Sequence, residues 1–541
     1  MDNNNGGSNF LDSKTILAIA LVGLVWFGWQ NYLQKKYPNQ NKIAETAPLA
    51  GAVSTVDNKT GTSTPTTIST SGAETAPQVE NQSESYTSYS GENFEFQISN
   101  FGMGVKNLRL HHYSDRAGGP IELARTDAQK FLEVNFVGKQ TPLNFTVTKK
   151  ANDEFEGRAD YMDMTLVKNM KIDQAKFTIN TSVSVENVND NFKGLNVYMS
   201  DFKEEYSSGT FLIPSFEHQE FLIAHSGTEE RINVSSSKES IAKTFEQVAM
   251  ISFGNQYFTT GILDKSSVIP EIKIVAEVSA KTPVAGTLTY KPLVQGSKYE
   301  LSFIGYAGPK SLDILQSVDP IMTKAVNLGF FGVLAKPMIF IMKWFHKFVH
   351  NWGFAIILLT LVVRLLVMPF TVMSYKSMKA MQKIQPALAS LREKYKNDPT
   401  TLNKEMMGLM KENKVNPLGG CLPMLLQIPV FIALYQVIGQ SIELYQAPFI
   451  FWIHDLSLKD PFYVLPVLMG ITMFIQQKIT PSTMDPTQQK IMMVLPVVFS
   501  LFMIALPSGL TLYIFVSTLF GIVQQFLLMR DKNIVAVAAK R

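Results

Sequence analysis

The spacing of hydrophobic residues changes along the chain and divides it into segments. An apolar run at residues 16–29 precedes a stretch, 38–90, that is rich in Ser, Thr, Ala, Gly and Asn. From about residue 91 apolar positions alternate with polar ones, and from about residue 353 long apolar runs take over. This pattern predicts an N-terminal anchor, a flexible tether, a β-rich domain and a membrane-spanning helical bundle.

Period-two alternation is the main feature of the predicted domain at 91–325. Phe94, Phe96 and Ile98 alternate with polar residues, and the segment Tyr299–Phe303 repeats the pattern. Several such strands between turn signals are typical of an antiparallel β-sandwich. The histidines of this domain show no spacing of a metal site or a catalytic triad, so we expect no catalytic residues and no enzyme activity. These histidines are His111, His112, His218 and His225.

Length and charge narrow the class of protein. The chain has 541 residues, too long for one domain, and its formal net charge of +4 is small for that length. Cys421 is its only cysteine, so neither an intramolecular disulfide nor a cysteine-cluster metal site can form. We therefore expect no sequence-specific nucleic-acid partner, no metal and no cofactor.

The N-terminal apolar run, within residues 1–37, has two interpretations. A cleaved signal peptide would be followed closely by a small-x-small cleavage site, whereas Gln30, Asn31, Tyr32 and Leu33 follow this run. The sequence therefore favours an uncleaved signal anchor, which the tether at 38–90 joins to the β domain.

The segment 326–352 mixes aromatic and aliphatic residues with Lys336, Lys343 and Lys347. Three lysines spread through an apolar segment favour an amphipathic helix that lies in the membrane interface over one that crosses the membrane.

Five apolar runs follow, at 353–370, 421–438, 462–475, 491–506 and 510–529. With the anchor they predict six spans, of which the second is assigned to 353–372 and the third to sixth to 417–530. Arg364 lies inside the second span. A buried arginine in a span is costly and usually functional, but Arg364 is only about 9 Å from Phe370 at helical rise and could instead snorkel to the interface.

Charged loops predict the orientation. The segment 373–416 and the tail 531–541 are basic, which places both termini in the cytoplasm and the β domain outside. Lys35 and Lys36 follow the first span and locally favour the reverse, but the bias of the downstream loops is larger. Within 373–416, apolar residues recur every three or four positions on both sides of Asp398, which predicts a helical hairpin.

Several long motifs carry a family resemblance. Arg364 lies in TLVVRLLVMPFT, and KVNPLGGCLPMLLQIPVFIALY covers 414–435. APFIFWIHDLSLKDPFYVLPVLMG covers 447–470, DPTQQKIMMVLPVVF covers 485–499, and LPSGLTLYIFVS covers 506–517. Together these motifs resemble the YidC/Oxa1/Alb3 membrane protein insertases. The anchor, tether and outer domain resemble the Gram-negative YidC type in layout.

The resemblance implies a five-helix core around a hydrophilic groove. Arg364 matches the groove arginine of the family, Thr360 shares its helix face, and Gln427 and Tyr513 match other groove positions. Ile514 departs from a family pattern that has a second aromatic residue there. A client-contacting slide is expected at Met424, Phe431, Met492 and Met503. The outer domain resembles a mutarotase-like β-sandwich without its catalysis.

The resemblance also implies a function. It predicts a multi-pass protein of the bacterial inner membrane that inserts nascent membrane proteins and helps them to fold, alone or with a Sec translocon. A ribosome or targeting factor is expected at the cytoplasmic hairpin. A solute transporter and a membrane-anchored carbohydrate-active enzyme are the alternatives; a transporter would usually show internal repeats, and we find none.

Overall fold

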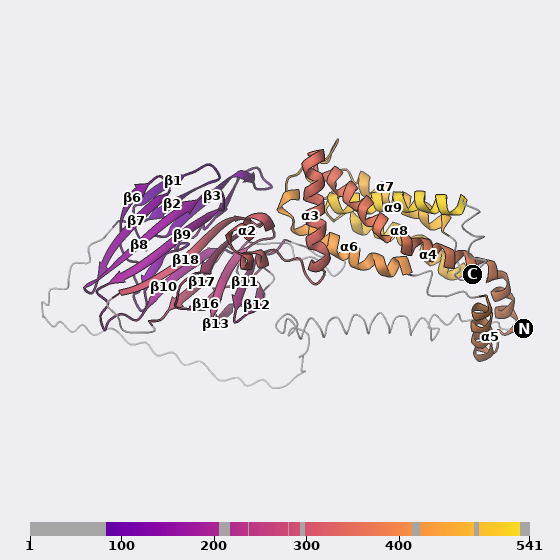
Figure 1. The fold of residues 1–541 in the computed structure, drawn as a ribbon, viewed down its shortest axis with the longest axis horizontal. Coiled ribbons are helices and arrows are strands. Elements are labelled where there is room, and N and C mark those ends of the chain that lie inside the picture. Colours follow the sequence, from indigo (N-terminus) through magenta and orange to yellow (C-terminus); the bar gives the residue numbers. More distant parts are fainter. Residues whose placement is uncertain are drawn as a thin grey trace, which may run out of the picture. The chain divides into compact units, whose positions relative to one another are not determined.

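The computed structural model describes residues 83–204, 217–235, 237, 239–279, 281–292, 298–413, 422–480 and 486–530. The predicted anchor at 1–37, most of the tether at 38–90 and the tail at 531–541 lie outside the described residues. Strands occupy the first part of the described chain and helices the second, as Figure 1 shows.

The β domain contains three sheets in its described residues. The four-stranded sheet has the order β1 (Tyr86–Ser90), β2 (Phe94–Ser99), β3 (Val105–Ser114), β4 (Pro120–Leu123). The five-stranded sheet has the order β13 (Ile241–Phe245), β16 (Glu271–Ala276), β17 (Pro283–Tyr290), β10 (Leu195–Phe202), β5 (Val134–Phe136). The nine-stranded sheet has the order β12 (Thr228–Asn233), β11 (Glu220–His225), β14 (Val248–Gly254), β15 (Phe258–Asp264), β18 (Lys298–Pro309), β9 (Thr178–Glu186), β8 (Met164–Asp173), β7 (Glu154–Tyr161), β6 (Thr146–Ala151).

Every strand pair in these sheets is antiparallel, which confirms the prediction from alternation. The side chains of Phe94 and Phe96 on β2 are buried, because every second residue of a strand faces the core. Gly286 of β17 lies beside Ile251 of β14 and Phe221 of β11. The five-stranded and nine-stranded sheets therefore pack face to face over a shared apolar core.

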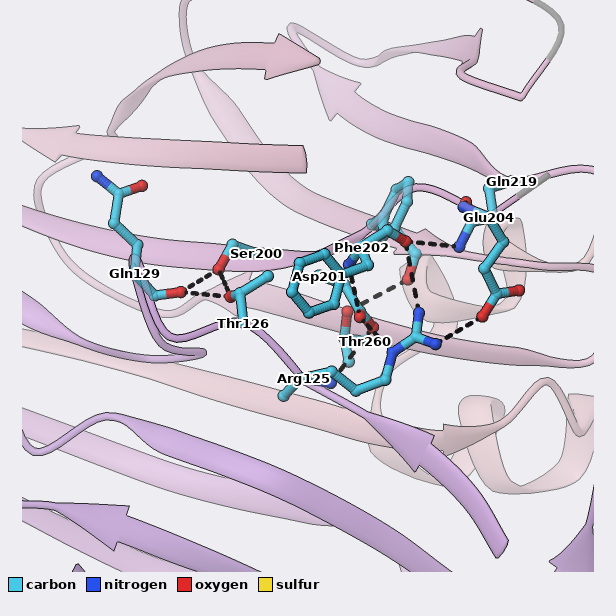
Figure 2. Close-up of polar contacts among 11 residues, drawn as sticks. Arg125, Thr126, Gln129, Ser200, Asp201, Phe202, Glu204, Gln219 and Thr260 are labelled. Atoms are coloured by element: carbon cyan, nitrogen blue, oxygen red, sulfur yellow. Dashed lines mark hydrogen bonds and ion pairs between the residues drawn. The ribbon is translucent and has the colours of Figure 1, made fainter. Parts of the chain in front are cut away.

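A buried cluster of polar side chains links the segment after β4 to the end of β10 (Figure 2). The Arg125 guanidinium donates from Nε to Asp201 Oδ1 at 2.8 Å and from Nη1 to Glu204 Oε1 at 2.7 Å. Burial raises the pKa of Asp201, and the adjacent Arg125 charge opposes that rise. A buried carboxylate requires such a partner, so this ion pair holds two distant segments together.

The helical region follows the last strand. Its elements are α2 (Leu312–Val318), the 3₁₀ helix η1 (Pro320–Ala325), α3 (Gly332–Val349), α4 (Trp352–Lys394), α5 (Pro399–Glu412), α6 (Leu422–Gln440), the 3₁₀ helix η3 (Ile442–Leu444), α7 (Val464–Ile479), α8 (Pro486–Met503) and α9 (Ser508–Arg530). α4 is continuous from the predicted second span through residue 372 into the predicted hairpin segment.

The α4–α5 turn has the local structure that its sequence predicts. The Asp398 carboxylate accepts hydrogen bonds from the backbone N–H groups of Thr400 and Thr401, both at 3.1 Å, and Pro399 occupies the first turn of α5. Ile384 and Leu388 of α4 form a small apolar cluster with residues of α5. The two helices therefore make a hairpin with its own core.

Two described helical segments are long and apolar enough to cross a membrane, Trp352–Lys394 and Ser508–Leu528. Val464–Ile479 and Met493–Met503 are shorter apolar helices. The predicted count of six spans is therefore not confirmed by the described residues.

Candidate functional site

A line of polar residues runs between the otherwise apolar helices α4, α6, α7 and α9. We call it the polar seam. Its members are Thr360, Arg364, Tyr375 and Lys379 on α4, Gln427 on α6, Gln476 on α7 with Thr480 directly after it, and Tyr513, Ser517, Gly521, Gln524 and Gln525 on α9. α9 lies against α4 and α7 along much of its length (Figure 1).

The spacing on α9 explains how the seam forms. Tyr513, Ser517, Gly521 and Gln525 are each four residues apart, so they lie on one face of the helix. All four are buried in the bundle. This face of α9 therefore carries three buried polar side chains, with Gly521 between Ser517 and Gln525, inside an otherwise apolar helix.

Arg364 lies at the middle of the seam. Its Nε donates a hydrogen bond to Ser517 Oγ at 2.7 Å, and the residue is half-buried. No carboxylate forms an ion pair with this guanidinium in the described part of the chain. A guanidinium whose one described hydrogen-bond partner is a hydroxyl keeps most of its capacity to attract an anion.

Gln427 and Tyr513, both predicted as site residues, are brought together by the fold. Gln427 Nε2 donates to the Tyr513 hydroxyl at 2.7 Å. Thr360, predicted to share the face of Arg364, donates instead to the Ile356 carbonyl of its own helix at 2.7 Å. Its hydroxyl is therefore satisfied locally.

Sequence reasoning missed the part of the seam nearer the hairpin. The Tyr375 hydroxyl and the Thr480 hydroxyl each lie 3.2 Å from Gln525 Oε1, and Lys379 Nζ donates to the Leu528 carbonyl at 3.1 Å. The four-residue spacing on α9 was the signal that could have found Gln525.

The side-chain amides of Gln524 and Gln525 are both buried, yet the Nε2 of neither has a hydrogen-bond partner among the residues that the structure describes. A buried donor without an acceptor typically costs about 1–3 kcal/mol. Such groups in a native structure require an explanation, and a ligand that accepts their hydrogen bonds is one.

The predicted client-contacting slide is only partly visible. Met503 is fully buried at the end of α8, and Phe431 is half-buried beside Tyr435 of the same helix. The side chains of Met424 and Met492 lie outside the described residues. Exposed apolar side chains line α7 and α8 instead, among them Val467, Ile471, Val494, Val497, Val498 and Leu501.

The β domain offers a second candidate site, a cleft of about 360 Å³. Its walls include Arg125, Asp201 and Glu204, together with Gln219 and Gln256. Asp201 and Glu204 are both engaged by Arg125 (Figure 2), so neither carboxylate is arranged as a general acid or base. No cluster of three metal-ligating side chains occurs among the described residues.

Comparison with known proteins covers both halves of the chain. Residues 344–535 match the family model described as 60Kd inner membrane protein, and residues 90–341 match that described as YidC periplasmic domain. A membrane protein insertase YidC from Geotalea daltonii is 33% identical over 538 residues, which cover 95% of this chain and 98% of the relative.

Other relatives align over a shorter length. A membrane protein insertase YidC from Geobacter metallireducens is 45% identical over 298 residues, so the chain spans about half the length of this relative, with 55% of each covered. A crystal structure titled as an active YidC insertase with its first transmembrane domain resolved is 20% identical, with 83% of this chain and 95% of that chain covered and a TM-score of 0.37.

Proposed function

This chain belongs to the YidC family of membrane protein insertases, and we propose that it inserts nascent inner-membrane proteins and helps them to fold, alone or with a Sec-type translocon. The family consists of insertases and not of enzymes. Its members are inner-membrane proteins with a large β-rich periplasmic domain. Family membership therefore argues against the two alternative functions, a solute transporter and a carbohydrate-active enzyme.

The proposed mechanism rests on one observation, the position of Arg364 in the polar seam. A client brings a polar segment that must pass the hydrocarbon ahead of its apolar span, and desolvation of that segment is the main barrier. The Arg364 guanidinium, which Ser517 holds at 2.7 Å, would stabilise acidic residues of this segment. A charge pair 4 Å apart gains about 4 kcal/mol at the intermediate polarity of a protein surface.

Release of the client would follow from its own apolar surface. The exposed apolar side chains of α7 and α8 offer a surface along which a client helix would leave toward lipid. Burial of that helix in hydrocarbon gains about 25 cal/mol per Å² of apolar area, so neither a nucleotide nor a covalent step is needed.

The predicted partners dock at other surfaces. In the α4–α5 hairpin the lysines at 376, 383, 404 and 411 are exposed, which suits electrostatic docking of a ribosome or targeting factor. The positive-inside rule supports our proposal that this hairpin and both termini lie in the cytoplasm and the β domain in the periplasm.

The test compares Arg364→Ala with Arg364→Lys in proteoliposomes, using two single-span clients whose translocated segments differ only in acidic residues. For the acidic client we expect the alanine variant to insert about tenfold less, which corresponds to about 1.4 kcal/mol, and the lysine variant to retain most activity. The neutral client should be affected far less. Equal insertion of the acidic client by the alanine variant would contradict the electrostatic step.

A further inference from the structure

We propose that Gln525 is a second binding station of the polar seam, which binds backbone peptide groups of the passing client. This inference rests on the proposed insertase function and adds a class of ligand, neutral peptide groups, that the Arg364 site does not favour. Gln525 lies eight residues beyond Ser517 on the same face of α9, about 12 Å farther along the helix axis toward the α4–α5 hairpin. The station is therefore distinct from the arginine site.

The geometry around Gln525 leaves half of its carboxamide unused. Its oxygen lies 3.2 Å from the hydroxyl of Tyr375 on α4 and 3.2 Å from the hydroxyl of Thr480 after α7. Thr480 also donates to the Gln476 carbonyl at 2.7 Å, so its one proton is shared between two acceptors. The Nε2 of Gln525 has no partner in the described part of the chain.

The neighbouring residue repeats this feature. Gln524 is also buried, and its Nε2 is also without a partner among the described residues. Two adjacent carboxamides with unused donors lie in a stretch where the next residues, Phe526 and Leu527, are exposed and apolar. The seam here is thus rich in hydrogen-bond donors that no described residue satisfies.

A peptide group is the ligand that this chemistry fits best. A carboxamide has one donor side and one acceptor side, as a backbone peptide group has, so the two can form paired hydrogen bonds. Arg364 can only donate, and its charge favours anions. A neutral carboxamide binds an unfolded backbone whatever its side chains are, and an extended polar segment is the part of a client whose peptide groups lack partners.

The location of the station also fits a passing chain. The two hydroxyls near Gln525 come from α4 and from the end of α7, the two helices that flank α9 here. A client that enters between α4 and α7 separates these contacts and uncovers the carboxamide. Lys379 lies at the same end of the seam, where it donates a hydrogen bond to the Leu528 carbonyl.

Disulfide crosslinking tests the contact in the full-length protein. In a Cys421→Ser background, Gln525→Cys, Ser517→Cys and the exposed neighbour Phe526→Cys are each combined with a stalled client that has one cysteine in its polar segment. We expect disulfides with positions 525 and 517 and few with position 526. Disulfides at 517 without any at 525 would overturn the second station and leave the proposed function standing, whereas disulfides at neither would defeat both.

Insertion kinetics test the ligand class. Gln525→Met keeps the side-chain length without its polar atoms, and we expect it to slow neutral and acidic clients alike by about fivefold, the value of one hydrogen bond. Arg364→Ala should slow mainly the acidic client and affect the neutral client far less. Tyr375→Phe is the comparison, because it removes one hydroxyl that contacts the Gln525 oxygen and leaves the Gln525 donor in place, so we expect a smaller loss than in Gln525→Met. Equal losses in Gln525→Met and Tyr375→Phe would show that Gln525 only joins helices, and would overturn the proposal.

Discussion

Gly521 permits close packing at the centre of the polar seam. A Cβ atom at this position would lie 2.6 Å from Gln476 Nε2 and 4.0 Å from the Arg364 Nη1 atom. Only a residue without a side chain lets the Gln476 carboxamide approach α9 beside the arginine. Glycine at position 521 therefore matters for the space inside the site as well as for the packing of α9.

Substitution Gly521→Ala should separate function from stability. The neighbour that must move is the end of a flexible side chain, and alanine favours a helix over glycine by about 1 kcal/mol, so we expect thermal stability to be kept or raised. The shifted Gln476 would narrow the space at Arg364, and insertion of acidic clients in proteoliposomes should fall. Gly408→Ala in α5 meets nothing within 4 Å and serves as the control. Unchanged insertion by Gly521→Ala would show that this space is not used.

Lys168 is a fully buried cation in the β domain. Its Nζ donates to the carbonyls of Met103 at 2.8 Å and Leu132 at 2.5 Å, so it joins two loops to β8. Burial lowers the pKa of Lys168 from its usual value of 10.5 to about 7, and the charge of Glu133 only partly opposes this. The folded chain therefore releases this proton several pH units before the unfolded chain does.

The stability of the β domain should consequently rise with pH. Above pH 7 the unfolded state holds a proton on Lys168 that the folded state lacks, so the free energy of unfolding increases by up to about 1.4 kcal/mol per pH unit from this group. Between pH 7 and 8 we expect Lys168→Met to remove most of that slope in urea unfolding of the full chain, followed by circular dichroism of the sheets. Lys310, whose burial lowers its pKa to about 8, contributes at higher pH. An equal slope in the variant would contradict this origin.

Residue identity alone revealed some members of the site and not others. An arginine in an apolar run is conspicuous because it is costly there, so Arg364 was predicted from the sequence. Gln525 was not, because a glutamine near the end of a span is ordinary and only its neighbours Tyr375 and Thr480 make it unusual. The contact of Arg364 with Ser517 joins positions 153 residues apart, and no local pattern gives such pairs.

At the scale of elements, the α4–α5 hairpin shows what the spacing of apolar residues can and cannot predict. The recurrence of apolar residues on both sides of Asp398 predicted the hairpin, and two of these residues, Ile384 and Leu388, are buried against α5 residues that include Met406 and Leu409. The continuity of α4 was less accessible, because prolines at 369 and 386 are signals that usually interrupt a helix. In a helix with neighbours the freed backbone groups can be satisfied elsewhere, so the element continues.

Because so few residues hold the hairpin together, one truncation should open it. Leu388→Ala removes one of the two buried side chains of the hairpin core, and losses of about 2–5 kcal/mol are typical of such changes in well-packed cores. We expect α5 to become protease-sensitive while α9 stays protected, as peptide mapping after limited proteolysis would show. Met407→Ala, at a side chain that is 71% exposed, is the control. Equal protection of α5 in both variants would mean that other contacts hold it.

At the scale of the whole molecule, alternation predicted the β-rich domain and apolar runs predicted the helical part. The sheet orders were not predictable, since β18 pairs with β9 and with β15, strands far from it in the sequence. Register between distant strands depends on packing of both faces, which one sequence does not show. For the same reason, the polar cluster around Arg125 (Figure 2) was not predicted from the sequence.

Lys343 on α3 joins three parts of the described chain. Its Nζ lies 2.9 Å from Asp313 Oδ2 on α2 and 2.7 Å from Glu443 Oε1 on η3. The Asp313 carboxylate is mostly exposed, whereas Lys343 and Glu443 are largely shielded from water. Most of the stabilisation should therefore come from the pair between α3 and η3, because exposed ion pairs contribute little.

Two substitutions distinguish these contributions. Lys343→Met leaves Glu443 shielded without a cation, which should lower the free energy of unfolding by about 1–3 kcal/mol, whereas Asp313→Asn should change it by less than about 0.5 kcal/mol. Thermal unfolding in detergent measures both, and the double variant Lys343→Met with Glu443→Gln should recover much of the loss, because it removes the stranded charge. If Asp313→Asn were as damaging as Lys343→Met, the exposed contact and not the shielded one would be what holds α3 in place.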